Sequence, residues 1–362
     1  MRQSRRRFLS AAGPIGSAAL MGAMQSGAQT ASGKARPLVL AIAEYQRFSS
    51  LELVGARQAG LEVKWLRGER NEMLRRAISD PAVDGGEGSM AAHLIRLDGG
   101  DRSMVALPVF VLRNFTARDV YTRADSRLKA AEWNGRRIGI YNWAASGATW
   151  YRHLIRYLGQ DPKRIRWVVG SPDQQTHPEP RGTLPGNVER APEGSSLSDL
   201  LLAGKLDAFF APLPPLRAQP GQGQIVRLFR DFRTVEKEYF QKTGCYPVQH
   251  VLLLRRANWE RDPSIGKRLV ELFQNCESKF EAAQRLFPYS TPWQIADVEE
   301  TEKVMGREFH AHGLEKNRRV VDVFCQGIFD DGVTRQRLSV DDVFGEFVKA
   351  NQANAAGSER RG

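Results

Sequence analysis

The chain has 362 residues, of which 41% are apolar and 26% are charged, and its formal net charge is +12. This composition is that of a soluble globular protein, and it excludes a collagen, a disordered chain and a polytopic membrane protein. The length allows two or three domains, or two lobes of one fold. Three scattered cysteines, Cys245, Cys276 and Cys325, are too few for a disulfide scaffold or a four-cysteine zinc site.

The first 28 residues have the order of an export signal. A basic start, Arg5-Arg6-Arg7-Phe8-Leu9, precedes a weakly apolar stretch of small residues that ends near Ser26-Gly27-Ala28. The paired arginines followed by Phe-Leu resemble a twin-arginine signal. We therefore expect residues 1–28 to be a twin-arginine signal peptide that engages the twin-arginine export machinery, and the mature protein to be periplasmic or otherwise exported. A disordered basic tail is the alternative.

Strands and helices alternate from residue 37 onward. Continuous or alternating apolar residues indicate strands, and apolar residues spaced three or four apart indicate helices. In chain order, the first unit is predicted to contain a strand over 38–43, a helix over 51–59, a strand over 61–66 and a helix over 69–78. This order predicts right-handed crossovers and a parallel sheet.

A second unit repeats the alternation and a helical region follows it. The predicted elements are a strand over 137–141, a helix over 146–158, a strand over 165–169, a long loop over 171–196, a helix over 198–203, a strand over 206–211, a strand over 251–254, mostly helices over 263–350 and a disordered tail over 354–362. We predict an α/β fold of two lobes with a helical C-terminal segment. Two such lobes suit a ligand-binding cleft that closes by hinge motion.

Some possible partners and cofactors are disfavoured by the motifs. The basic residues are spread out, which argues against nucleic acid and is compatible with anionic small ligands. The segment Gly86-Glu87-Gly88-Ser89-Met90-Ala91 matches a dinucleotide pattern but lies too far into its unit, so we interpret it as a bend that lets the backbone approach a ligand. Glu308, His310 and His312 are spaced two residues apart, and this spacing points side chains the same way only on a strand, whereas the segment is predicted to be a loop. We therefore expect no metal ion there, and no other cofactor.

Three residues are candidates for binding an anion. Ser146 opens the predicted helix over 146–158, where free backbone N–H groups and the helix dipole can receive a carboxylate. Arg113 and Arg152 could each pair with a carboxylate through two hydrogen bonds. The residues alone leave simpler alternatives open, in which Ser146 only caps its helix and each arginine forms a surface ion pair.

One segment resembles a hallmark of a known family. It runs from Arg227-Leu228-Phe229-Arg230-Asp231 through Glu236, Tyr239-Phe240 and Thr243-Gly244 to Tyr246-Pro247-Val248-Gln249-His250. The order is similar to that of the 4,5-dihydroxyphthalate decarboxylase-like family, with Tyr246 in place of a Phe and Val248-Gln249 in place of Ile-Met.

Further blocks agree with this family in order over about residues 38–345. They are Tyr45 with Arg47; Asp84, Glu87 and Ser89; Pro108-Val109-Phe110 with Arg113; Asn134 to Gly139; Trp150 with Arg152; Leu206-Asp207-Ala208; and Gly313-Leu314-Glu315 with Asn317-Arg318. His93 and His312 each replace a Tyr of the family pattern, which suggests that the ligand differs.

The resemblance implies a type II periplasmic-binding-protein fold, with a ligand between two lobes that two crossover strands join. Lobe 1 would comprise residues 37–113 and 251–350, and lobe 2 residues 114–250 with the crossover strands. The residues then expected to bind the ligand in the interlobe cleft are Tyr45, Glu87, Ser89, Arg113, Ser146, Arg152 and His250.

Two functions are compatible with this resemblance, because the family includes aromatic-carboxylate decarboxylases and proteins named as ABC transporter substrate-binding components. The export signal favours an exported solute-binding protein for a small anionic organic ligand, with an aromatic carboxylate as first choice and a membrane transporter as candidate partner. The alternative is a decarboxylase of the 4,5-dihydroxyphthalate type, a carboxy-lyase. In that enzyme His250 would protonate the ring carbon as carbon dioxide leaves, and Glu236 would tune His250.

Overall fold

The computed structural model describes residues 36–51, 61–129, 132–175, 184–219, 221–286 and 291–359. The predicted signal peptide, and the predicted helix over 51–59 beyond its first residue, lie outside these ranges. Across the described ranges, no helix combines the length and the apolar composition that crossing a bilayer requires.

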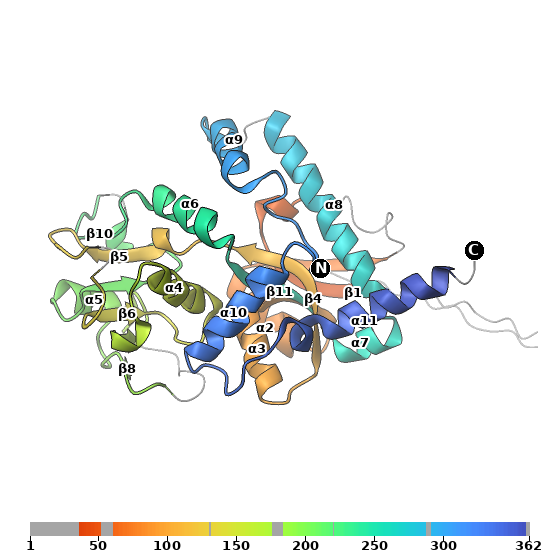
Figure 1. Ribbon diagram of the computed structural model, residues 1–362, viewed down its shortest axis with the longest axis horizontal. Helices are drawn as coiled ribbons and strands as arrows, with labels where there is room; N and C mark the ends of the chain where they lie inside the picture. The colour runs from red at the N-terminus through yellow and green to blue at the C-terminus, as the bar shows by residue number, and fades with distance from the viewer. Residues whose placement is uncertain are drawn as a thin grey trace, which may run out of the picture. The chain divides into compact units, whose positions relative to one another are not determined.

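Among the described residues, five strands form the first sheet, in the order β2-β1-β3-β11-β4. Figure 1 labels β1, β11 and β4 of this sheet. They are β1 (Leu38–Ala43), β2 (Val63–Gly68), β3 (Gly85–Ser89), β4 (Met104–Arg113) and β11 (Val248–Arg255). Strand β1 runs parallel to β2 and β3, whereas β11 is antiparallel to β3 and β4. A strand from late in the chain therefore lies between two strands from its first third.

The glycine-rich segment interpreted as a bend is strand β3, in the middle of this sheet. A Cβ atom on Gly86 would lie 2.0 Å from the carbonyl oxygen of Ala41, and one on Gly85 would lie 2.2 Å from that of Leu253. These two glycines thus make room for the neighbouring strands rather than for a ligand. The interpretation as a bend was wrong. Glycine is depleted in strands, so the composition of this segment did not indicate one, and its pairing with β1 and β11 is what makes it a strand.

In the part of the chain that the structure describes, six strands form the second sheet, in the order β10-β5-β9-β6-β7-β8. They are β5 (Val120–Arg123), β6 (Arg137–Ile140), β7 (Arg166–Val169), β8 (Val188–Arg190), β9 (Ala208–Phe210) and β10 (Ile225–Arg227). Strand β6 is parallel to β7 and β9, whereas β5 is antiparallel to β9 and β10. Strand β8 lies within the segment predicted to be a loop over 171–196, where three residues are too short a pattern to recognise.

The chain passes between the two sheets twice. It leaves the first sheet after Arg113 at the end of β4 and enters the second at Val120 in β5. It returns from β10 through helix α6 (Phe232–Thr243) to β11. Each sheet therefore has its own α/β unit, and the first is assembled from two separate stretches of chain.

Helices follow most strands and make up the C-terminal segment. They are α2 (Arg70–Ser79), α3 (Met90–Asp98), α4 (Ser146–Tyr157), α5 (Leu197–Leu202), α7 (Arg256–Arg261), α8 (Ser264–Leu286), α9 (Gln294–Met305), α10 (Arg318–Asp330) and α11 (Val340–Glu359). Helix α11 continues through part of the tail predicted to be disordered from residue 354. The stretch after Asn354 contains Ala355 and Ala356, and alanine has the highest helix propensity.

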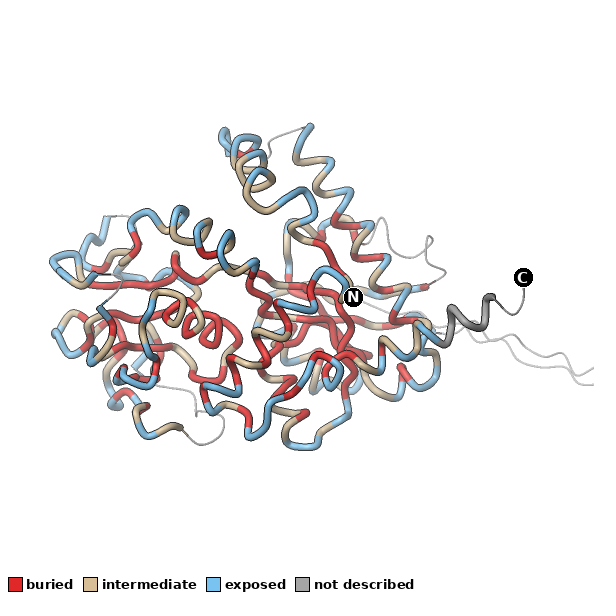
Figure 2. Tube along the Cα trace, in the orientation of Figure 1, coloured by how far each residue is buried: buried red, intermediate tan, exposed pale blue. Residues whose placement is uncertain are grey.

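The apolar core connects the C-terminal segment with both units. One cluster of buried side chains lies against the first sheet and includes Leu252 and Phe273. A larger cluster contains Met90 of α3, Trp150 of α4 and Phe324 of α10, and the rings of Trp150 and Phe324 are 5.6 Å apart. Figure 2 shows that the buried segments follow the strands and the inner sides of these helices. Helix α10 therefore contributes to the packing of elements from both units.

We expect Gly86→Ala to lower the free energy of unfolding by about 3 kcal/mol or more, because the added methyl group would meet backbone atoms of β1. Gly186→Ala is the matched control, since a Cβ atom there meets nothing within 4 Å. Urea unfolding followed by circular dichroism measures both variants. Equal stability of the two variants would contradict the close approach of β3 to β1.

Candidate functional site

A cavity of about 1020 Å³ is lined by elements of both sheets. From the first unit come one face of α2, the end of β3, one face of α3 and the start of β11. From the second unit come the segment between β6 and α4 and the segments after β7 and β9. The ends of parallel strands and the starts of the helices that follow them are where α/β proteins place ligands.

The Glu87 carboxylate is the centre of a buried hydrogen-bonded group next to this cavity. Its side chain is fully buried, and Oε1 accepts a hydrogen bond from the Tyr45 hydroxyl at 2.6 Å. Its Oε2 accepts one from the Ala43 amide at 3.1 Å. His250 Nδ1 lies 2.5 Å from Oε1. Burial raises the pKa of Glu87, but the hydrogen bonds and charge of His250, with the bonds from Tyr45 and Ala43, outweigh burial and hold the pKa below its ordinary value.

The ionised Glu87 determines how His250 presents its ring. A carboxylate can only accept, so Nδ1 of His250 must carry the hydrogen that lies between them. Nε2 has no hydrogen-bond partner within the described part of the chain, and His250 lines the cavity. The arrangement of a carboxylate, an oriented imidazole and an open cavity can bind an acidic group or transfer a proton.

Ser89 and Ser146 bring two helix starts together at the cavity. Ser89 caps α3 through a hydrogen bond from the Ala92 amide, and Ser146 is the first residue of α4. Their hydroxyl oxygens are 3.0 Å apart, and the Ala91 amide donates to Ser146 Oγ at 3.0 Å. This contact joins an element of the first unit to one of the second, and it directs two positive helix ends towards the same space.

Arg70 is a cavity residue that the sequence analysis missed. It is the first residue of α2, lines the cavity and is half-buried, and it forms no ion pair or hydrogen bond through its side chain among the described residues. Burial and Glu87 raise the pKa of Tyr45, and burial raises that of Tyr141, while the Arg70 charge lowers both. The charge of Arg70 therefore acts on tyrosines of both units.

A sequence signal for Arg70 did exist. The residues three and four positions away from it in either direction are Leu66, Arg67, Met73 and Leu74, none of which is acidic. An arginine at a helix start without an acidic neighbour at these spacings lacks the usual surface partner. The signal is weak, because an acid from elsewhere in the chain could have paired with it.

Arg152, expected in the cleft, lies apart from the cavity. Its side chain is fully buried, and Nε donates to Asp331 Oδ2 at 2.5 Å while Nη1 donates to the Trp143 carbonyl oxygen at 3.0 Å. The guanidinium also lies 4.0 Å from the centre of the Trp143 ring. An arginine with these partners ties α4 to the segment after α10 and is not free to bind a carboxylate.

Arg113 is likewise held by the protein. It is buried, donates to the Tyr246 carbonyl oxygen at 3.2 Å and to Asn317 Oδ1, and lies between the end of β4 and the start of β11. The nearby Arg47 forms an ion pair with the buried Glu277 at 2.7 Å. These arginines support the segments that connect the two sheets rather than line the cavity.

The remaining candidates from the sequence lie elsewhere. His312 Nδ1 accepts a hydrogen bond from the Phe110 amide at 3.1 Å, and the described ranges hold no group of three or more side chains suited to a metal. Glu236 lies on α6, where it accepts a hydrogen bond from the Arg118 amide at 2.9 Å. The carboxylate that contacts His250 is that of Glu87 rather than that of Glu236.

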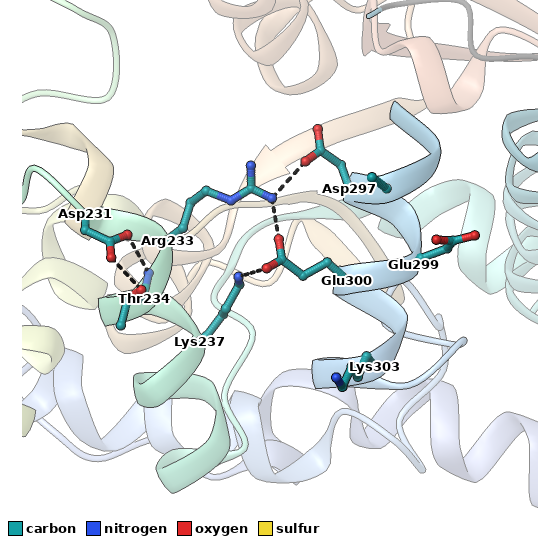
Figure 3. Close-up of a pocket in the computed structure, with 9 residues that line it drawn as sticks. Asp231, Arg233, Thr234, Lys237, Asp297, Glu299, Glu300 and Lys303 are labelled. Atoms are coloured by element: carbon teal, nitrogen blue, oxygen red, sulfur yellow. Dashed lines mark hydrogen bonds and ion pairs between the residues drawn. The ribbon is translucent and has the colours of Figure 1, made fainter. Parts of the chain in front are cut away.

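A second hollow of about 730 Å³ lies between α6 and α9. Figure 3 shows Arg233 directed towards Asp297 and Glu300, and Lys237 towards Glu300. Arg233 lies 2.8 Å from Asp297 and 2.5 Å from Glu300. The charges lining this hollow largely neutralise one another near the surface, where ion pairs contribute little. We therefore take the first cavity as the candidate site.

No known protein-family model matches the sequence. The chain is 27% identical over 317 residues to a 4,5-dihydroxyphthalate decarboxylase of Comamonas testosteroni, which covers 85% of this chain and 96% of that protein. The chain is a homologue of that decarboxylase.

Solved structures show the same fold. The periplasmic aliphatic sulphonate binding protein SsuA of Escherichia coli matches with a TM-score of 0.52 and 14% identity, over 85% of this chain and 91% of that chain. The periplasmic sulfonate-binding protein SsuA of Methylobacillus flagellatus matches with a TM-score of 0.53 and 12% identity, over 88% and 94%. The resemblance to the 4,5-dihydroxyphthalate decarboxylase-like family and the two-lobed α/β fold, both inferred from the sequence, are confirmed.

A pH-dependent stability difference is expected for Glu236→Gln. Burial raises the pKa of Glu236 to about 7, although the Arg118 amide acts against it. A carboxyl group whose folded pKa exceeds its unfolded value makes the wild type less stable as the pH rises from about 4.5 to about 7. The glutamine variant lacks this loss and keeps an acceptor for the Arg118 amide. It should therefore gain about 2 kcal/mol on the wild type across this window.

Urea unfolding of both proteins between pH 4.5 and 8 measures this difference. Glu238→Gln is the control, because it removes an exposed carboxyl group from the same helix. The prediction fails when Glu236→Gln differs from the wild type by the same amount at every pH.

Proposed function

We propose that this protein binds a small aromatic carboxylate in the cavity between its two lobes. The observation that carries the proposal is Arg70, a half-buried cavity arginine without a protein partner among the described residues. A carboxylate entering a site with little water needs a positive partner, and an arginine supplies both charge and two parallel hydrogen bonds.

Two further features support an anionic ligand. The starts of α3 and α4 meet through Ser89 and Ser146 at the cavity wall, so the positive ends of two helix dipoles lie beside the cavity. His250, when protonated, adds a donor at Nε2 while Glu87 holds its other nitrogen. The aromatic part of the proposal rests on the named activity of the Comamonas relative, whose substrate is an aromatic dicarboxylate.

Export and lobe movement belong to the same proposal. The twin-arginine pattern at Arg5-Arg6 and the periplasmic-binding fold support a periplasmic protein that delivers its ligand to a membrane transporter of the ABC type. We divide the mature chain into lobe 1, residues 37–113 and 251–350, and lobe 2, residues 114–250. The ligand would close the cleft by contacting both lobes at once.

A decarboxylase is the second candidate, and the Glu87–His250 pair favours it. Loss of carbon dioxide leaves the electron pair of the broken C–C bond on the ring carbon, which must then take up a proton. Protonated His250 could donate that proton from Nε2 and regain one from water, while Glu87 stabilises the imidazolium. Arg70 would hold a carboxylate that stays on the ring.

Arg70→Ala tests the binding proposal. We expect the affinity for 4,5-dihydroxyphthalate, measured by isothermal titration calorimetry, to fall by about tenfold to 150-fold, because a charged hydrogen bond contributes about 1.5–3 kcal/mol. Arg76→Ala is the matched control on the same helix, since Arg76 pairs with Asp80 and does not line the cavity. The proposal fails when Arg70→Ala binds as tightly as Arg76→Ala, or when the wild type binds neither this acid nor phthalate nor benzoate.

His250→Gln separates the two candidates. Incubation of the wild type with 4,5-dihydroxyphthalate, followed by measurement of released carbon dioxide, should show no turnover for a binding protein. For a decarboxylase, His250→Gln should reduce the turnover rate by at least about a hundredfold. Its affinity for 4,5-dihydroxyphthalate should stay within about tenfold of the wild-type value, because proton transfer contributes more to the rate than to ground-state binding. Turnover that survives in His250→Gln would remove His250 as the acid.

A further inference from the structure

Three residues that line the cavity come together at the start of α4. Gly147 is the second residue of this helix, Tyr141 follows β6, and Gln249 is near the start of β11. A Cβ atom on Gly147 would lie 3.2 Å from the hydroxyl oxygen of Tyr141 and 3.7 Å from Oε1 of Gln249. Because glycine has no side chain, Gly147 leaves the space next to these two oxygens open.

Both oxygens are available to a ligand. Within the described part of the chain neither of them has a hydrogen-bond partner, and neither is among the partnerless polar atoms that lack accessible surface. Tyr141 is half-buried, and 8% of Gln249 is exposed. Polar atoms of mostly buried side chains normally have partners, so two such oxygens on the wall of one cavity indicate a polar group of the ligand beside them.

The hydrogen-bonding capacity of each oxygen defines that group. Nε2 of Gln249 donates to the Asn114 carbonyl oxygen at 3.1 Å, so the other end of the amide is the oxygen Oε1, which can only accept. Burial raises the pKa of Tyr141, so its hydroxyl group keeps its proton at neutral pH and can donate or accept. A ligand group that both donates and accepts therefore satisfies the two oxygens together.

A local irregularity of β11 brings Gln249 to the cavity wall next to His250. Consecutive side chains of a regular strand point to opposite faces of the sheet. The pairing of β11 with β4 shifts register between Val248 and His250, and Gln249 and His250 both line the cavity. Such irregularities redirect side chains. The fold therefore adds Gln249 to a wall that already contains His250.

Charged groups do not fit this position. A carboxylate would place its negative charge against Oε1 of Gln249, which has no hydrogen to donate. An ammonium group would meet the positive end of α4, whose first turn is not capped by a side chain because the N-cap residue is Ala145. A hydroxyl group is neutral, donates one hydrogen bond and accepts others, so it meets both conditions.

We propose that Tyr141 and Gln249 form a subsite for a ring hydroxyl group of the ligand, which donates to Oε1 of Gln249 and accepts from the Tyr141 hydroxyl. This inference rests on the proposed function and narrows its ligand class to hydroxylated aromatic carboxylates. The resembling family has an apolar Met at the position of Gln249. Gln249 is thus a specificity-determining residue of this chain.

The test compares the three isomers of hydroxybenzoate with the methylbenzoates substituted at the same ring positions, by isothermal titration calorimetry on the mature protein. A methyl group is similar in size to a hydroxyl group but forms no such hydrogen bond, so the affinity ratio of each pair measures recognition of the hydroxyl. In the wild type, at least one position should favour the hydroxyl by about tenfold or more. Two hydrogen bonds then form, whereas a methyl group leaves both oxygens unpaired.

Tyr141→Phe and Gln249→Met each remove one of the two hydrogen bonds. The preference for the hydroxyl should fall by about threefold or more in Tyr141→Phe. In Gln249→Met it should disappear or reverse, because the methionine makes this wall apolar. Tyr157→Phe is the matched control, since it removes a hydroxyl group from a half-buried tyrosine of α4 that does not line the cavity, and it should keep the wild-type preference. Each ratio is taken within one protein, so a general loss of affinity in a variant cancels.

A wild-type preference below about twofold at every ring position overturns the inference, since one hydrogen bond alone contributes about that much. A preference that survives unchanged in Tyr141→Phe or in Gln249→Met overturns it as well. So does tighter binding of an aminobenzoate than of the hydroxybenzoate substituted at the same position, because the subsite would then favour a group that mainly donates.

The outcomes separate this inference from the proposed function. Binding of benzoate and the methylbenzoates that depends on Arg70, without preference for a hydroxyl at any position, overturns the inference and leaves the proposed function standing. Failure of the wild type to bind 4,5-dihydroxyphthalate, phthalate, benzoate and all the substituted benzoates overturns both.

Discussion

The buried Glu87 carboxylate is the interaction on which the site depends. Ala43 at the end of β1, Tyr45 just after it and His250 on β11 all donate to this one side chain of β3. An ionised carboxylate without these donors could not stay buried, because an unpaired charge in the interior costs several kcal/mol. The same contacts hold three strands in register and direct one nitrogen of His250 towards the cavity. The stability of the first sheet and the geometry of the site therefore both depend on the Glu87 side chain.

The cavity itself depends on contacts between the two units. Ser89 and Ser146 meet across it, and the Arg152–Asp331 pair joins α4 to the segment after α10. Helix α10 also packs its Phe324 against Trp150. The C-terminal segment thus supports an element of each unit, which positions the start of α4 relative to the start of α3. The two helix starts are thus already in contact without a ligand. A ligand that bridged them would strengthen this contact between the two units and would not be the only thing that holds the units together.

The arginines of this chain differ in the partners that the fold gives them. Arg152 and Arg113 are buried and hydrogen-bond to Asp331, Asn317 and backbone carbonyl groups. Arg70 has no such partner within the described residues and lines the cavity. Their places in the regular elements differ, since Arg70 opens α2, Arg113 ends β4 and Arg152 lies within α4, but none of these places reveals the partner of the side chain. The difference lies in which acceptor groups the fold brings close to each guanidinium. This explains why Arg113 and Arg152, which were expected in the cleft, do not line the cavity.

The sequence by itself determined the alternation of strands and helices, the helical C-terminal segment and the family resemblance, because periodicity and ordered motifs are properties of neighbouring residues. It also pointed to Glu87, Ser89, Ser146 and His250, which the structure places beside one cavity or along its wall. It could not show that the glycines of β3 lie between two strands. Nor could it show that Arg152 pairs with an acid 179 positions away, whereas Arg70 forms no ion pair with any described residue. Only the tertiary structure decided these points, because burial and the pairing of charges depend on residues that the fold, and not the chain order, brings together.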